Sequence, residues 1–205
     1  MVMKMNCTGV VLAGGESSRF PIHKAFAHYD GEYFYERAVS CLKPAVSSVY
    51  LVAHPSIAHK LSASSAMVIQ DLPYLQGQGP LAGILTAMNI REGADWYAVI
   101  TCDMPLMRTE IYEILLTAAL CTPGIQAVVP VVKERQQPLA ALYHKSCKPV
   151  IYKLLTEGKR SMYGLLQSVN TKYIDELCGD WNPHDFININ TQEDYSLYIE
   201  KGLRE

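Results

Sequence analysis

Several features that mark other classes of protein are missing from this sequence of 205 residues. No apolar run approaches the length of a membrane span, and residues 1–6 lack the apolar core of a secretion signal. The chain has no block of like charges and no Ser-, Gly- or Pro-rich linker, so ordered globular structure is expected throughout. These absences predict a cytoplasmic protein that does not associate with a membrane.

An excess of basic residues is missing as well. Lysines and arginines number 18 against 20 aspartates and glutamates, which gives a formal net charge of -2. A protein that covers nucleic acid needs a basic face, so this balance argues against nucleic acid as a partner. A local pocket for a small anionic ligand remains compatible with it.

The motifs of several enzyme classes do not occur. The six cysteines form no CxxC pair, the six histidines show no HExxH spacing, and no serine lies in a G-x-S-x-G elbow. A cytosolic chain of this length needs no disulfides. The cysteines are therefore expected to be small buried or half-buried thiols: Cys7, Cys41, Cys102, Cys121, Cys147 and Cys178.

What the sequence does contain is a regular alternation of apolar runs and amphipathic segments. Strands are predicted over residues 9–12, 48–52, 67–69 and 96–101, and helices over 34–42, 56–61, 81–89 and 109–120. Mixed α/β segments follow at 127–132, 139–143, 147–155, 161–169 and 172–174. The alternation indicates right-handed βαβ crossovers. The expected fold class is α/β, a three-layer doubly wound structure with a mostly parallel sheet, formed by a single domain over residues 1–205.

Residues 8–24, TGVVLAGGESSRFPIHK, combine a buried strand with a glycine turn and two cations. Gly14 and Gly15 have no Cβ, so the backbone can turn sharply and its N–H groups can approach a phosphate chain. Arg19 and Lys24 add a planar fork and a point charge for phosphate oxygens. The segment is neither a Walker A motif nor a G-x-G-x-x-G motif, and the glycines alone would also fit an ordinary tight turn.

Two acidic residues follow predicted strands. Asp71 comes after the strand at 67–69, and Asp103 comes after the strand at 96–101. In a doubly wound sheet both fall at the carboxyl edge, together with the glycine turn, which is where ligands bind. Asp103 is well placed to hold Mg²⁺, which favours one or two carboxylates with phosphate oxygens and water. The alternative is that Asp103 forms a turn or caps the next helix.

The segment FININTQED near the end of the chain offers a second contact for a metal. Alternation places Asn188 and Asn190 on one face, where both amides could look into the cleft. These asparagines could equally cap turns before the last helix. That helix is predicted to begin at Thr191, with Asp194 completing the capping box.

The pattern L-A-G-G-x-S-x-R-x-x-x-x-K resembles the N-terminal signature of the molybdenum cofactor guanylyltransferases. The matching residues are Leu12, Ala13, Gly14, Gly15, Ser17, Arg19 and Lys24. The resemblance extends over nearly the whole chain and implies a Rossmann-like nucleotidyltransferase fold. The sequence departs from the family at Pro21, where glycine is usual, and at His23, where an acidic residue is common.

On the matching positions, the resemblance implies three groups of site residues. Catalysis would fall to Lys24, Arg19 and Asp103. Nucleotide binding would fall to Leu12, Ala13, Gly14, Gly15, Lys24, Asp71, Gly79 and Asp103. The metal would be held by Asp103 and Asn190, and the acceptor would face Gln137, Pro138 and Asn188.

The chain is expected to have a nucleotide-binding half at about 1–122 and an acceptor-side half at about 123–205. In the second half, the run from Gln136 to Leu139 resembles the acceptor-facing motif of the family. The basic residues nearby could receive the acceptor's phosphate or be plain solvated charges: Lys133, Arg135, Lys159 and Arg160.

The reaction implied by the resemblance is Mg²⁺-dependent transfer of GMP from GTP to molybdopterin that carries molybdenum. Other proteins of molybdenum cofactor biosynthesis, or acceptor proteins, would be partners. Base choice stays open, because Val52, Ala53 and His54 stand where family members often have an asparagine. A cytidylyltransferase or a sugar-phosphate nucleotidyltransferase of the same fold is one alternative, and a non-catalytic nucleotide or pterin carrier is another.

Overall fold

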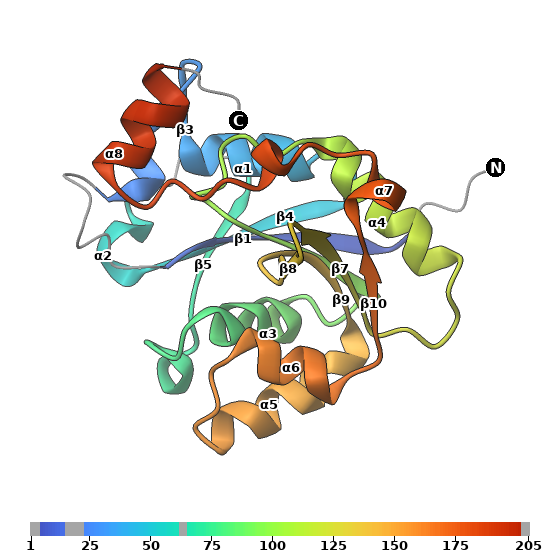
Figure 1. The fold of residues 1–205 in the computed structure, drawn as a ribbon. Coiled ribbons are helices and arrows are strands. Elements are labelled where there is room, and N and C mark those ends of the chain that lie inside the picture. The colour runs from blue at the N-terminus through green and yellow to red at the C-terminus, as the bar shows by residue number, and fades with distance from the viewer. Residues whose placement is uncertain (1–4, 15–22, 62–64, 202–205) are drawn as a thin grey trace.

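A twisted central sheet organises the molecule (Figure 1). The structure is a computed structural model that describes residues 5–14, 23–61 and 65–201. The strand order is β10-β7-β9-β6-β1-β4-β5, and β8 pairs with β7 beside this path. The strands are β1 Cys7–Ala13, β4 Ser48–Ala53, β5 Met67–Gln70, β6 Trp96–Thr101, β7 Ala127–Val132, β8 Arg135–Gln136, β9 Ala140–His144 and β10 Thr171–Ile174.

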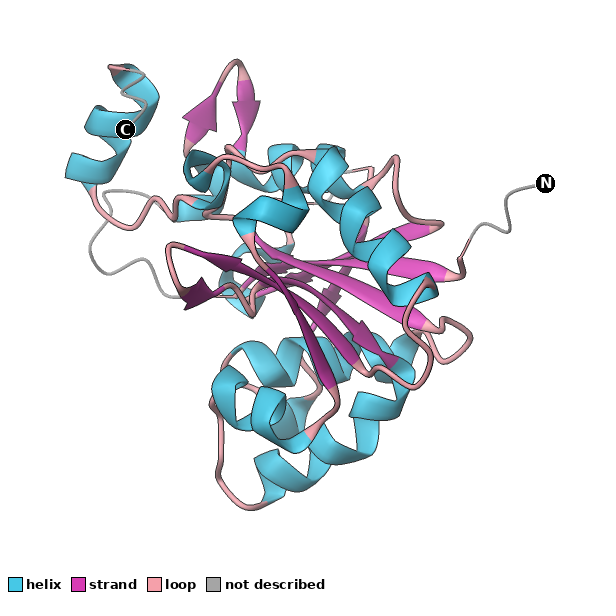
Figure 2. Cartoon of the chain, turned by 45° about the vertical axis from the view of Figure 1, so that its right-hand side comes forward, coloured by secondary structure: helices cyan, strands magenta, loops and turns pink. Residues whose placement is uncertain are grey.

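Helices cover both faces of this sheet. In Figures 1 and 2, α1 and α4 lie on one face, and α3, α5 and α6 lie on the other. The helices are α1 Phe34–Leu42, α2 Pro55–Ala58, α3 Pro80–Ile90, α4 Thr109–Leu120, α5 Lys148–Thr156, α6 Met162–Ser168, α7 Glu176–Gly179 and α8 Gln192–Asp194. Two large apolar clusters fill the spaces between the sheet and the two helical layers. The prediction of a three-layer α/β fold is confirmed.

The direction of the strands is parallel with one exception in the main path. β1 runs parallel to both β4 and β6, β5 runs parallel to β4, and β10 runs parallel to β7. β9 is antiparallel to both of its neighbours, β6 and β7. All residues of β1 are buried, as expected for a strand covered on both faces. The sheet is therefore mixed but mostly parallel.

The parallel strands bring their carboxyl ends to one edge of the sheet. Gly14 follows β1, His54 follows β4, Asp71 follows β5, and Asp103 lies two residues beyond β6. The C-terminal segment crosses the same edge, because the backbone N–H of Ile189 donates to the Asp103 carbonyl at 2.8 Å. This edge gathers the residues that the sequence analysis singled out.

Several short elements differ from the predicted ones. A two-stranded hairpin, β2 His28–Tyr29 and β3 Glu32–Tyr33, encloses the turn at Asp30 and Gly31. α2 ends at Ala58, earlier than the predicted 61. The helix that Thr191 caps is only three residues long and continues as a π-helical turn, η5 Tyr195–Glu200.

The expectation for the cysteines was partly wrong. All six are free thiols, and four are buried. Cys121 and Cys178 are exposed, because each lies at or near the end of a helix on the surface of the molecule. In the part of the chain that the structure describes, no helix is long and apolar enough to cross a membrane.

An ion pair ties the C-terminal segment to the body of the protein. Nε and Nη2 of Arg108 each lie 3.0 Å from Oδ2 of Asp185. Asp185 is 8% exposed and also accepts from the backbone N–H of Asn182 at 3.1 Å. Because residues 187–190 follow directly, this contact helps to place Asn190 at the sheet edge.

Replacing Arg108 with alanine is expected to destabilise the protein. The change leaves the buried Asp185 carboxylate with fewer partners, at a cost of about 1–2 kcal/mol in the free energy of unfolding. Urea denaturation would measure it, with the substitution of the exposed Arg91 as the matched control. Equal midpoints for both variants would contradict the tethering role of the pair.

Candidate active site at the carboxyl edge of the sheet

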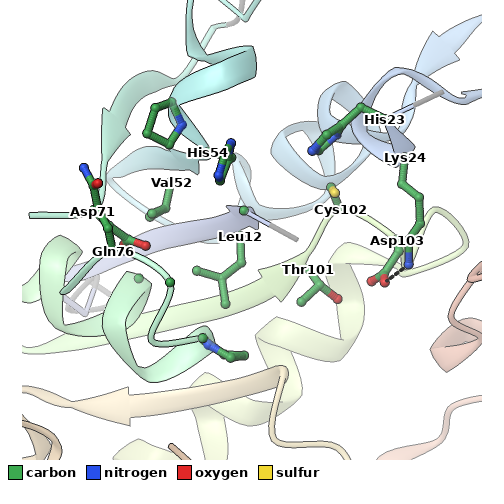
Figure 3. A pocket seen from close by; sticks show the side chains of 16 residues that line it. Leu12, His23, Lys24, Val52, His54, Asp71, Gln76, Thr101, Cys102 and Asp103 are labelled. Atoms are coloured by element: carbon green, nitrogen blue, oxygen red, sulfur yellow. Dashed lines mark hydrogen bonds and ion pairs between the residues drawn. The ribbon is translucent and has the colours of Figure 1, made fainter. Parts of the chain in front are cut away.

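A cavity of about 280 Å³ opens at the carboxyl edge, close to the lower end of the size range for small-molecule sites. Figure 3 shows Leu12 on its floor, with Asp71 to one side and Lys24 and Asp103 to the other. His54 projects into the space between them. The lining residues are Leu12, Gly14, His23, Lys24, Val52, His54, Pro55, Asp71, Gln76, Gly77, Gly79, Pro80, Gly83, Thr101, Cys102 and Asp103.

Lys24 bridges two oxygen atoms from distant parts of the chain. Its Nζ lies 3.1 Å from Oδ2 of Asp103 and 2.6 Å from Oδ1 of Asn190. The side chains of Lys24 and Asp103 are only 18% and 20% exposed, so water screens their attraction less than at an open surface. Asp103 does not cap the next helix, since the N-cap of α4 is Arg108, but it does lie in the turn that follows β6.

Two oxygen atoms near this pair lack a hydrogen-bond partner within the described chain. They are Oδ1 of Asp103 and Oγ1 of Thr101, and both are buried. Buried polar atoms without a partner are rare and call for a bound ion, water or ligand. The described residues contain no group of three or more His, Cys, Asp or Glu that could hold a metal. A metal here would thus have few protein ligands, all of them oxygens.

These donors fit Mg²⁺. This ion prefers oxygen ligands and completes its shell with water and substrate phosphates rather than with a full protein cage. The carboxylate of Asp103 and the amide oxygen of Asn190 already flank a cation, the ammonium group of Lys24. Asn188 is half-buried in the same segment, and neither it nor Asn190 lines the cavity.

Asp71 is held from the first turns of α3. The Thr86 hydroxyl lies 3.4 Å from Oδ1 of Asp71 and accepts from the backbone N–H of Leu72 at 3.3 Å. Burial raises the pKa of the Asp71 carboxyl, while the Thr86 hydroxyl and nearby His54 act in the opposite direction. Ionisation of the Asp71 carboxyl in this position therefore destabilises the folded state.

Close packing of α3 against the sheet forms the floor of the cavity. A Cβ at Gly83 would lie 2.7 Å from a methyl group of Leu12 and 3.4 Å from a methyl group of Val52. Gly79 precedes the helix with φ of +79°, a conformation that glycine adopts readily. The N-terminus of α3 therefore lies at this edge, and its partial positive charge favours an anionic ligand.

His54 caps the short helix α2 with one ring nitrogen. Its Nδ1 lies 2.8 Å from the Ser56 hydroxyl and accepts from the Ser56 backbone N–H at 3.3 Å. His54 therefore keeps its ring in a fixed position at the end of β4, where it lines the cavity.

The structure brings together most of the residues predicted for the site. The lining includes Leu12, Gly14, Lys24, Asp71, Gly79 and Asp103, and Asn190 contacts Lys24. Ala13 packs in the apolar core on the face opposite to Leu12, and Gln137 and Pro138 do not line the cavity. Gly15, Ser17, Arg19 and Pro21 lie outside the described residues.

Sequence reasoning missed several lining residues. Thr101 and Gln76 carry no recognisable motif, although Thr101 ends β6 and Gln76 lies in the loop before α3. The sequence pointed to His54 only as a departure from the family at the position linked to base choice. Gly83 carries only a weak signal, since a small residue in a helix permits a close approach without saying to what. Thr101, His54 and Gln76 could have been predicted from their position in the sequence, at or just after the carboxyl ends of strands or in the loop before α3.

The fold and the edge site define an α/β nucleotidyltransferase. More particularly, the chain belongs to the family of MobA-like NTP transferases, whose domain model matches residues 9–172. It is 43% identical over 196 residues to a probable molybdenum cofactor guanylyltransferase of Bacillus cereus, covering 95% of this chain and 96% of the relative. A protein of the same description from Halalkalibacterium halodurans is 40% identical over 189 residues, covering 92% and 95%.

Solved structures agree with this assignment. The crystal structure of molybdopterin-guanine dinucleotide biosynthesis protein A from Archaeoglobus fulgidus matches with a TM-score of 0.80 at 26% identity, over 95% of this chain and 98% of that one. The 4-diphosphocytidyl-2C-methyl-D-erythritol synthase of Anaerococcus prevotii matches with a TM-score of 0.76 at 12% identity, over 98% and 97%. The second likeness is one of fold alone.

Replacing Asp71 with asparagine is expected to stabilise the protein at neutral pH. The raised pKa means that the folded state binds the Asp71 proton more tightly than the unfolded chain does. The cost of ionisation is absent below the unfolded pKa of about 4 and appears as pH rises through the folded pKa. Melting temperatures from pH 3 to pH 8 should diverge upward in favour of the variant. A wild type that is equally stable at pH 7 would contradict this account.

Proposed function

We propose that this protein transfers GMP from GTP to molybdopterin that carries molybdenum, forming the guanine dinucleotide cofactor and pyrophosphate. The bridge of Lys24 between Asp103 and Asn190, at the edge of a nucleotide-sized cavity, is the observation that carries the proposal. The descriptions of relatives about 40% identical over most of their length support the choice of donor and acceptor.

The two ends of the cavity suit the two ends of a nucleotide. Leu12, Val52 and Gly83 form an apolar floor beside Asp71, which suits a base whose edge carries N–H groups. Lys24 lies beside Asp103 at the other end, which suits the triphosphate. Ala13, Gly14, Gly15 and Gly79 complete the proposed nucleotide-binding set from the sequence.

The proposed reaction needs little covalent help from the protein. An oxygen of the acceptor phosphate forms a bond to the α-phosphorus, and the bond from that phosphorus to the bridging oxygen of the leaving pyrophosphate breaks. The acceptor phosphate is already ionised, so no general base is required. Lys24 and Arg19 would offset the negative charge that develops, and positioning would supply most of the rate.

Asp103 and Asn190 are the residues that would hold Mg²⁺. The unpartnered Oδ1 of Asp103 and the amide oxygen of Asn190 offer the hard oxygen donors that this ion prefers. When bound, the ion neutralises phosphate charge at the reacting centre. Lys24 would then be released from Asp103 to contact phosphate.

The acceptor would lie toward the second half of the chain. We assign nucleotide binding to about residues 1–122 and the acceptor side to about 123–205 of a single domain. Gln137 and Pro138 precede β9, whose Ala140 pairs with Ile100, so they lie beside the end of β6. Asn188 lies in the segment that crosses Asp103. Proteins that supply molybdopterin or accept the product would be the partners.

The Lys24→Ala and Asp103→Asn variants are each expected to lower kcat at least about a hundredfold, because each substitution removes a preorganised charge beside the reacting phosphate. Pyrophosphate release from GTP, Mg²⁺ and molybdopterin would measure it. Alanine at the exposed Lys60 is the matched control. Tight binding of GTP without any turnover by the wild type would instead favour a carrier.

GTP is expected to raise the melting temperature of the wild type more than CTP or UTP does. A ligand that binds only the folded state stabilises it according to its concentration and affinity. Thermal denaturation with each nucleotide at equal concentration and constant Mg²⁺ would show the order. Equal shifts would defeat the assignment of guanine, and a larger shift with CTP would favour a cytidylyltransferase.

A further inference from the structure

The ammonium group of Lys24 lies against the same two oxygens that would hold a divalent cation. Its Nζ is 3.1 Å from Oδ2 of Asp103 and 2.6 Å from Oδ1 of Asn190. Figure 3 shows this group directed at the Asp103 carboxylate. A Mg²⁺ ion would bind both oxygens at about 2.0–2.1 Å. If Lys24 stayed in place, the two cations would lie very close together, and like charges at such a distance repel each other.

The charges of this cluster are balanced without a metal. Asp103 carries one negative charge and Lys24 one positive charge, while the Asn190 side chain is neutral. Among the described residues that line the cavity, Lys24 is the only lysine or arginine. A divalent cation added beside Lys24 would therefore lack a compensating charge, in a place where the two side chains are only 18% and 20% exposed. Uncompensated charge that water reaches poorly is costly.

Loss of the ammonium group would leave a cluster of oxygens. Oδ1 of Asp103 is buried and has no hydrogen-bond partner within the described chain, and Oδ2 would lose its contact with Lys24. The backbone bond from Ile189 to the Asp103 carbonyl does not involve Lys24, so the two segments would stay close together. A carboxylate and an amide oxygen held in this way suit a hard divalent cation.

We propose that Lys24 is an internal substitute for the metal, which keeps a divalent cation out of the site until a nucleotide binds. The phosphates of the nucleotide offer the ammonium group another anionic partner, so that it leaves Asp103 and Asn190 as the cation arrives. Nucleotide binding and metal binding are then coupled through one side chain, and each raises the affinity for the other by the same factor. The proposal rests on the proposed function, because that function supplies the nucleotide.

The same exchange keeps the C-terminal segment in place before and after the metal binds. In the metal-free protein, the contact of Lys24 with Asn190 ties residues 187–190 to the beginning of the chain. With the metal bound, the cation would join the oxygens of Asp103 and Asn190 in place of the ammonium group. One cation thus holds the segment in each state.

The affinity for Mn²⁺ in the absence of nucleotide tests the proposal. We expect the Lys24→Met variant to bind Mn²⁺ about tenfold more tightly than the wild type, which lies within the usual range of coupling between two ligands. Electron paramagnetic resonance of the free ion measures this affinity. The exposed Lys60→Met variant is the matched control and should bind Mn²⁺ as the wild type does. The difference should persist at high salt, which screens the attraction of distant exposed charges.

The sign of the change separates this role from a merely structural one. A lysine that only stabilised the fold or positioned Asp103 would, when replaced, leave the affinity for Mn²⁺ unchanged or lower it. Either result would overturn the proposal. Adding Asp103→Asn to Lys24→Met should abolish the gain, and a gain that survived this change would place the ion elsewhere and overturn the proposal as well. Lys24→Ala gives a second test of the same effect, should Lys24→Met fail to fold.

Hydrogen exchange at the backbone N–H of Ile189 provides a second measurement, since this group donates to the Asp103 carbonyl. Without metal, exchange at this position should be faster in Lys24→Met than in the wild type. Mg²⁺ should slow it in the variant and change it little in the wild type. Equal exchange in the two metal-free proteins would overturn the role of Lys24 in holding the segment.

Neither measurement uses GTP or the acceptor, so the two proposals can fail separately. If the wild type releases no pyrophosphate from GTP and molybdopterin, the proposed function fails, and tighter binding of Mn²⁺ by Lys24→Met still supports the exchange. If pyrophosphate is released but Lys24→Met gains no affinity for Mn²⁺, the exchange fails and the proposed function stands.

Discussion

The contact of one ammonium group with two oxygens joins the parts of this protein on which its site depends. Asp103 and Asn190 lie 79 and 166 residues after Lys24 in the chain, yet an oxygen of each lies no more than 3.1 Å from Nζ of Lys24. Each residue is held in place in a different way. Asp103 lies just after a buried parallel strand, and Asn190 comes directly after Ile189, whose backbone N–H donates to the Asp103 carbonyl. Lys24 is the first residue of a short 3-10 helix (η1, Lys24–Phe26). The site exists because all three arrive at one sheet edge.

This arrangement places function in conflict with stability at several points. Asp71 is partly buried at a cost, two positive-φ residues occupy a hairpin that glycine would relieve, and a buried carboxylate oxygen of Asp103 has no partner in the described chain. Each such feature lies at the carboxyl edge. The two apolar clusters on the faces of the sheet offset the free-energy cost of these features, because burial of apolar surface is the dominant favourable term in folding.

The sequence predicted the strongly periodic elements well and the weakly specified ones poorly. The helix at 34–42 and the strand at 96–101 coincide with α1 and β6, because clear apolar periods and clear breakers bound them. The segment at 127–132, for which neither helix nor strand was specified, forms β7. The antiparallel direction of β9 was not predicted, since local pattern does not encode strand direction. Asp71 and Asp103 were found by their place after predicted strands. Thr86 and Thr101 were not found, because the role of a hydroxyl depends on which residues the fold brings next to it.

The backbone bond from Ile189 to Asp103 also has a bearing on how the molecule is made. The β1, β4, β5 and β6 strands are complete long before residues 183–190 leave the ribosome, so a nascent chain can assemble its nucleotide cavity while Asn190 is still unsynthesised. The oxygen pair around Lys24 forms only when the last segment docks across the edge. The contact between Lys24 and Asn190 is thus made late in biosynthesis, and a chain that ends before residue 183 would lack it.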